Sequence, residues 1–266
     1  KFWDRFVKTG SSHYVIPALY FKLKQRDFLK LLNAELVSYL EEIYNQNYNR
    51  NKELVKEVNE ISHLLKTHSI NHVFLKGAAL VSSIYKQSIG VRMVGDIDIL
   101  IAKDQIQKAK NLLELFSYSP KTPFEPFFNY NEKHLDRMIN KNKLFAIELH
   151  FKITDREIKH EDFLDSKKMI NYIFIPKTSN LLFHSIINFQ LNDYGSLRAT
   201  FHFRTLFDVF NLGKPDLIHE ISNFSHLEKI KVVMKNLNII KFNIPLRLFL
   251  FESRFKLINS LYIFFL

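Results

Sequence analysis

The 266-residue sequence contains no cysteine, so it can form neither a disulfide framework nor a thiolate metal site. This absence fits a reducing, cytoplasmic setting. The six glycines and seven prolines are spread over the whole chain, which favours helices over a turn-rich β-sandwich. No uninterrupted apolar run reaches the roughly 18 residues of a membrane span. A hydrophobic content of 47% with 24% charged residues therefore indicates a folded globular protein without stable membrane insertion.

Two further features bear on possible partners. The C-terminal stretch 246–266, LRLFLFESRFKLINSLYIFFL, is apolar but interrupted by charges, which predicts an amphipathic helix with a partner surface. The formal net charge of +11 would suit a polyanionic partner such as nucleic acid. However, the sequence has no Arg-rich block and no run of five or six like charges. A composition rich in Lys, Asn, Ile and Phe, typical of an AT-rich genome, explains the charge equally well.

Hydrophobic periodicity predicts an α+β organisation. Residues 14–66 follow a helical pattern, apart from YNQNYNRN (44–51), which predicts a loop or a frayed helix end. Buried strands are predicted at 71–76, 96–102 and 143–153, with helices at 77–85 and 103–116 and a looser segment at 119–130. From about residue 158 the pattern predicts only helices, one of them ending at Gly213. We therefore expect an N-terminal helical segment (1–70), an α/β core (71–157) and a helical substrate-side domain (158–266).

The core segment contains acidic residues where apolar ones are expected. Asp96 and Asp98 lie two apart in the strand GDIDILI, so their side chains point to the same face. Glu148, in FAIELHF, could converge on them from a neighbouring strand. Three adjacent carboxylates suit Mg²⁺ or Mn²⁺, and two such ions about 4 Å apart could clamp a phosphoryl or nucleotidyl transfer. His150 shares a face with Glu148, where it could orient that residue, touch substrate, or simply be a satisfied polar residue.

The segment FLKGAAL (74–80) reads as a strand, a glycine and a helix start, where backbone N–H groups can hold phosphate. Gly77 would allow close approach of the phosphate, and Lys76 would add a positive charge. A tight turn with a solvated lysine is the alternative. Arg92, four residues before Asp96, could reach a triphosphate or merely close a surface loop.

These residues together resemble a known family. The order LKGAAL, GDIDILI, ELHF is similar to that of the DNA polymerase β nucleotidyltransferase superfamily, and within it to the bacterial group described as uncharacterised nucleotidyltransferases. The resemblance implies a small mixed β-sheet with flanking helices and two Mg²⁺ ions. Carried over, Gly77 is the phosphate turn, and Asp96, Asp98 and Glu148 are the metal-binding and catalytic carboxylates. Ala78 stands where many superfamily members have serine, which leaves nucleotide specificity open.

The stretch FHFRTLFDVFNL (201–212) resembles the family's later helix that carries Arg and Asp. This likeness implies that Arg204 and Asp208 lie on the substrate side, although their i, i+4 spacing also suits an ordinary helical ion pair.

The expected function is metal-dependent transfer of a nucleoside monophosphate from an NTP, such as ATP, to an acceptor. The acceptor could be a small molecule, a peptide or a tRNA. A catalytically silent binding module with this fold and a tRNA-directed nucleotidyltransferase toxin are the alternatives.

Overall fold

The computed structural model describes residues 2–121, 133–154, 161–188 and 202–213. Its internal contacts divide the chain into two compact units, Lys1–Lys177 and Thr178–Leu266. Every strand within the described residues belongs to the first unit.

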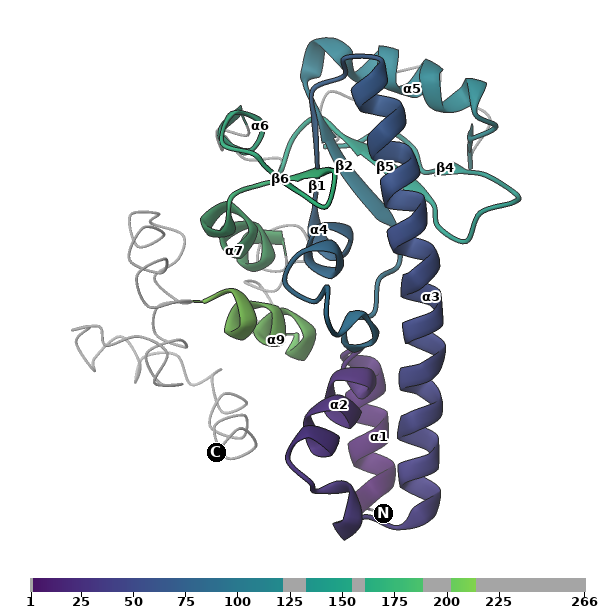
Figure 1. Ribbon diagram of the computed structural model, residues 1–266, viewed down its shortest axis with the longest axis vertical. Coiled ribbons are helices and arrows are strands. Elements are labelled where there is room, and N and C mark those ends of the chain that lie inside the picture. The colour runs from purple at the N-terminus through teal and green to yellow at the C-terminus, as the bar shows by residue number, and fades with distance from the viewer. Residues whose placement is uncertain (1, 122–132, 155–160, 189–201, 214–266) are drawn as a thin grey trace, which may run out of the picture. The chain divides into compact units, whose positions relative to one another are not determined.

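The first unit begins with helices, and strands and further helices follow in mixed order (Figure 1). The helices and 3₁₀ turns are α1 (Phe2–Ser12), α2 (Ile16–Gln25), η1 (Leu29–Leu31), α3 (Ala34–Thr67), α4 (Lys76–Ser82), η2 (Ile89–Val91), η3 (Lys103–Gln105), α5 (Ile106–Leu115) and α6 (Glu161–Asp165). The strands are β1 (His72–Phe74), β2 (Ile97–Ile101), β3 (Ser119–Pro120), β4 (Met138–Ile139), β5 (Ile147–His150), β6 (Lys168–Ile170) and β7 (Ile173–Ile175).

Five strands form one mixed sheet in the order β1-β2-β5-β4-β3. Strands β2 and β5 are parallel, whereas β1, β4 and β3 join the sheet in antiparallel pairs. All residues of β1, β2 and β5 are buried, including the charged Asp98 and Glu148. This architecture confirms the predicted α+β fold, a small mixed sheet with flanking helices. The three predicted strands appear where expected, although β5 is shorter than the apolar run that predicted it.

Helix α3 is 34 residues long and runs from the N-terminal helices to the sheet (Figure 1). It begins at Asn33, whose side chain accepts a hydrogen bond from the Leu36 backbone N–H at 2.8 Å. The predicted loop or frayed end at 44–51 was wrong, because the helix is continuous there. Asn47 and Asn51 are buried and bond to backbone carbonyls of the segment 89–92, and these tertiary contacts offset their low helix propensity.

The prediction of helices only after residue 158 was also wrong. Strands β6 and β7 form a separate antiparallel hairpin within the first unit. Its two turn residues, Asn171 and Tyr172, both have positive φ, as in the type I′ turns that match strand twist. The turn lacks glycine, so the usual sequence signal of a tight hairpin is missing.

The second unit contains α7 (Thr178–Ile187) and α9 (Phe203–Leu212), which pack against each other. Helix α9 ends at Gly213, as predicted, and the Gly213 N–H donates to the Val209 carbonyl at 2.7 Å. The predicted amphipathic helix at 246–266 lies outside the described residues. Among the helices that are described, none is both long and apolar enough to cross a membrane.

Candidate active site

Strands β2 and β5 place two carboxylates side by side. Asp98 and Glu148 are paired positions in the parallel register, so their side chains leave the sheet on the same face. Only 1% of Asp98 and 6% of Glu148 is exposed. Two buried like charges are strongly unfavourable unless cations or hydrogen-bond donors compensate them.

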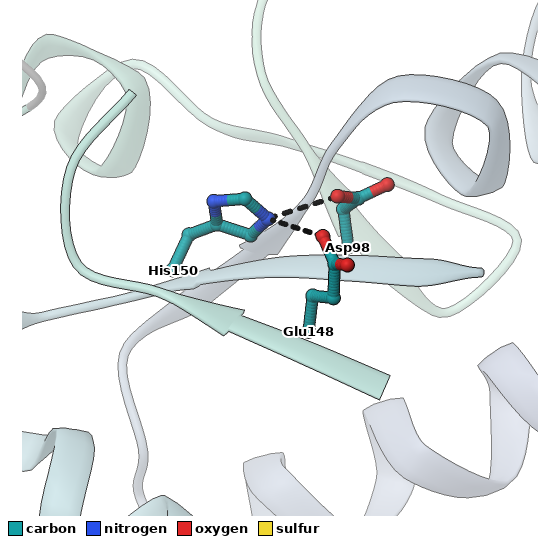
Figure 2. A group of neighbouring side chains, drawn as sticks. All are labelled: Asp98, Glu148 and His150. Carbon is teal, nitrogen blue, oxygen red and sulfur yellow. Dashed lines mark hydrogen bonds and ion pairs between the residues drawn. The ribbon is translucent and has the colours of Figure 1, made fainter. Parts of the chain in front are cut away.

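His150 completes a compact group with these two carboxylates (Figure 2). It follows Glu148 by two residues on β5, and its Nε2 lies 2.8 Å from Oδ1 of Asp98 and 3.5 Å from Oε2 of Glu148. One potential ligand atom from each of the three buried residues lies within 4.8 Å of the others. Two carboxylate oxygens and one imidazole nitrogen at this spacing could hold a divalent ion.

The third predicted carboxylate, Asp96, lies one residue before β2 begins. Its side chain is 22% exposed, compared with 2% for the side chain of Asp98. Asp96 is connected to Glu148 through the guanidinium of Arg137, whose Nη2 is 2.7 Å from Oδ2 of Asp96 and whose Nε is 2.6 Å from Oε1 of Glu148. Asp96 therefore forms the outer, more solvated part of the acidic cluster.

Arg137 was missed by the sequence analysis. It lies just before β4, in a segment whose sequence, KHLDRMIN, has no motif that marks it as part of a site. Pairing of β4 with β5 in the sheet brings it opposite Glu148, and sequence reasoning cannot supply this pairing.

Lys76 supplies the second cation of the cluster. Its Nζ lies 2.5 Å from Oδ1 of Asp98 and 3.9 Å from Oε2 of Glu148. Lys76 is also the first residue of α4 and has φ of 45°, a left-handed conformation that is uncommon for a residue with a Cβ atom. Such backbone conformations often persist at functional sites because the surrounding structure enforces them. Lys76, which the sequence predicted to bind phosphate, pairs in this structure with the carboxylates of Asp98 and Glu148.

The neighbouring Gly77 is explained by packing. A Cβ atom there would lie 2.7 Å from Cγ1 of Val94, closer than such atoms approach. Ala78, the position where many superfamily members carry serine, is completely buried. The phosphate-binding roles of Gly77 and Ala78 remain predictions.

The carboxylates of the cluster differ in acidity. The pKa of Asp96 is raised to about 6, because burial disfavours its charge and Asp98 and Glu148 repel it. Burial would also raise the pKa of Glu148, but hydrogen bonds from His150 and Arg137 outweigh this effect and lower it to about 2. Burial acts in the same way on Asp98, yet the charge of Lys76 and the bond to His150 hold its pKa well below the usual range. Asp98 and Glu148 therefore stay ionised at neutral pH.

Polar side chains of α3 hold the segment that leads into Asp96. Asn47 donates to the Gly90 carbonyl at 2.7 Å, and Asn51 donates to the carbonyls of Ile89 and Arg92 at 2.5 and 2.7 Å. Arg50 donates to the Val94 carbonyl, and its guanidinium lies 4.6 Å from the centroid of the Phe145 ring.

The spacing of Asn47, Arg50 and Asn51 puts them on one helix face, which is the signal that the loop prediction overlooked. These contacts fix the backbone from which Asp96 extends.

A known protein family matches most of the sequence. The family model described as "uncharacterised nucleotidyltransferase" matches residues 1–212. The chain belongs to this family. No curated protein matches the sequence. Family membership implies an NTP substrate, and it agrees with the resemblance inferred from about residues 54–153.

Of the remaining predicted site residues, Arg92 belongs to the first unit, and Arg204 and Asp208 belong to the second. Arg92 lies in the segment before Asp96. It is 8% exposed, and its guanidinium donates to the Met93 carbonyl. Arg204 and Asp208 lie one turn apart on α9 of the second unit, and Asp208 is buried. The triphosphate role of Arg92 and the substrate-side roles of Arg204 and Asp208 remain predictions.

Proposed function

We propose that the protein transfers a nucleoside monophosphate from an NTP to an acceptor, with release of pyrophosphate, in a reaction that depends on Mg²⁺ or Mn²⁺. The observation that carries the proposal is the register pair Asp98 and Glu148 with His150, a buried group of oxygen and nitrogen ligands in a chain of a nucleotidyltransferase family. A divalent ion at this group would polarise the α-phosphate and orient the attacking and leaving oxygens.

Each residue of the site has a distinct part in this proposal. Asp98 and Glu148 would hold the ion, because they remain ionised while buried. Asp96, more exposed and less acidic, would complete the ion site and help to remove the acceptor proton. Lys76 is within reach of the same group and would stabilise negative charge that develops on the phosphate. His150 would orient Asp98 through its Nε2 contact or bind the ion directly.

The decisive experiment supplies each α-³²P-labelled NTP, with Mg²⁺ or Mn²⁺, to the protein together with a metabolite extract, a peptide mixture or tRNA. Mass spectrometry of the labelled product would identify both nucleotide and acceptor. Asp98→Asn and Glu148→Gln should each lower transfer about 100-fold or more, since each removes a charged ligand. Asp104→Asn removes the same charge from an exposed position of η3 and should leave transfer unchanged.

One observation supports a second candidate, a binding module without catalysis. Lys76 and Arg137 compensate two of the three negative charges of the acidic cluster, so the protein itself supplies most of the charge compensation. Nucleotide binding that needs no divalent ion, together with no transfer to any acceptor, would favour this module over the enzyme.

A further inference from the structure

Arg137 forms ion pairs with two carboxylates of the cluster, the more exposed Asp96 and the buried Glu148. It uses a different nitrogen for each, Nη2 for Asp96 at 2.7 Å and Nε for Glu148 at 2.6 Å. A guanidinium has five N–H donors, and these two contacts use two of them. Neither contact is the paired, bidentate arrangement in which arginine binds a carboxylate most strongly.

A β-bulge fixes the position of Arg137. Met138 is the partner of Ile147, whereas His134 is the partner of His150. Counting inward from these two pairs, both Asp136 and Arg137 lie opposite Glu148, so one strand has an extra residue. Bulges of this kind redirect a side chain and recur next to active sites. The backbone thus keeps Arg137 beside Glu148 whatever its side chain binds.

Arg137 is also the more easily displaced of the two cations. Half of its side-chain surface is exposed, compared with 25% for Lys76. Ion pairs that are partly exposed contribute little net free energy, because water solvates the separated charges well. Lys76, by contrast, is held more deeply, against the buried Asp98.

The charges of the cluster favour a displacement when a divalent ion binds. Asp96, Asp98 and Glu148 carry three negative charges, and Lys76 and Arg137 carry two positive ones, which leaves a single negative charge when His150 is neutral. A divalent ion at these carboxylates would compete with both cations for the same three side chains, although the cations contact different oxygens. Arg137 is the cation that can leave, and its guanidinium then needs another anion.

We propose that Arg137 exchanges partners during the reaction cycle, neutralising Asp96 and Glu148 when no ion is bound and binding the nucleotide triphosphate once these carboxylates hold an ion. This inference rests on the proposed nucleotidyltransferase function. The planar fork of a guanidinium matches phosphate oxygens as well as carboxylate oxygens, and a triphosphate brings the negative charge that the loaded site lacks. Arg137 is therefore a second phosphate ligand in addition to Lys76, and it makes ion-free nucleotide binding weak.

The exchange predicts opposite effects on two ligands, which can be measured without any acceptor. Binding of Mn²⁺ alone is followed by electron paramagnetic resonance, and binding of inorganic tripolyphosphate in saturating Mn²⁺ by calorimetry. Arg137→Gln should bind Mn²⁺ about tenfold more tightly, because a competing cation is gone, and should bind tripolyphosphate about tenfold more weakly. Arg137→Lys should lie between the variant and the wild type in both measurements. Lys143→Gln, which removes the same charge from the ion pair with Glu60, should change neither.

The outcomes separate this inference from the function on which it rests. Wild-type protein that binds no Mn²⁺ would overturn both. Wild-type binding combined with weaker or unchanged Mn²⁺ binding in Arg137→Gln would overturn the exchange alone and would make Arg137 a structural clamp of the carboxylates. Circular dichroism of each variant shows whether it is folded, and Arg137→Lys provides the comparison if the glutamine variant is not.

Discussion

Asp98 and Glu148 are direct cross-strand partners on the parallel strands β2 and β5, although 50 positions separate them in the sequence. Because side chains alternate between the two faces of a sheet, a register shifted by one residue would put them on opposite faces. The apolar residues between which they stand, such as Ile97 and Ile147, fix the register by their own burial. The hydrophobic pattern of the strands thus determines whether the acidic cluster exists.

Asp96 should make the ion-free protein less stable as the pH rises. Its pKa is raised to about 6 in the folded protein from an ordinary value of 3.8, so the folded state holds this proton more tightly than the unfolded chain. The contribution of Asp96 to the free energy of unfolding should therefore fall between about pH 4 and pH 6. Asp96→Asn lacks this contribution.

Urea unfolding in EDTA at several pH values would test this effect. The free energy of unfolding of the wild type, relative to that of Asp96→Asn, should decrease across the window. A relative stability that stays constant or increases from pH 4 to pH 6 would contradict the raised pKa.

Gly77→Ala should destabilise the protein by about 1–3 kcal/mol, the usual effect of overpacking a filled site. The added Cβ would meet Cγ1 of Val94 at 2.7 Å. Val94→Ala removes the clashing methyl groups, so the double variant should recover part of the loss. Thermal denaturation of the two single variants and the double variant gives the coupling energy. Strictly additive losses would show that the clash is not the reason for glycine at this position.

Asn51→Ala should weaken Mn²⁺ binding as well as stability. Its side-chain amide donates to the carbonyls of Ile89 and Arg92, and the segment that these bonds hold leads to Asp96. Loss of buried hydrogen bonds of this kind costs about 1–3 kcal/mol. Asn59→Ala is a matched control on the same helix, since the Asn59 side chain is exposed and bonds only to the Val55 carbonyl of α3 itself. If both variants bind Mn²⁺ as the wild type does, the segment does not position Asp96.

Arg204→Ala should lower nucleotidyl transfer about tenfold and leave Mn²⁺ binding intact, since a residue that binds the acceptor contributes orientation rather than ion coordination. Asn211→Ala, an exposed position of the same helix, is the control. A lower melting temperature with unchanged transfer would show instead that Arg204 acts within its own helix, near the buried Asp208.

Local sequence patterns were sufficient for much of the fold. The largely apolar runs at 71–76, 96–102 and 143–153 predicted the three central strands, because a buried strand is specified by its own residues. Segment 44–51 was misjudged because asparagine disfavours helices locally, whereas in α3 two of its asparagines are satisfied by a distant segment. The β6–β7 hairpin was missed because Asn171 and Tyr172 adopt positive φ without the help of glycine.

The acidic cluster, like the fold, was predictable from the sequence only in part. The sequence by itself determined that Asp98 and Glu148 stand in buried strands, since period-2 alternation and apolar neighbours are local properties. Only the tertiary structure decided which charges neutralise them. Lys76 reaches Asp98 from the start of α4, and Arg137 reaches Glu148 and Asp96 across β4 and β5. Ion pairs depend on distances between segments that are remote in the sequence. The sequence pattern contains no such distances, so it did not predict that Arg137 pairs with Asp96 and Glu148.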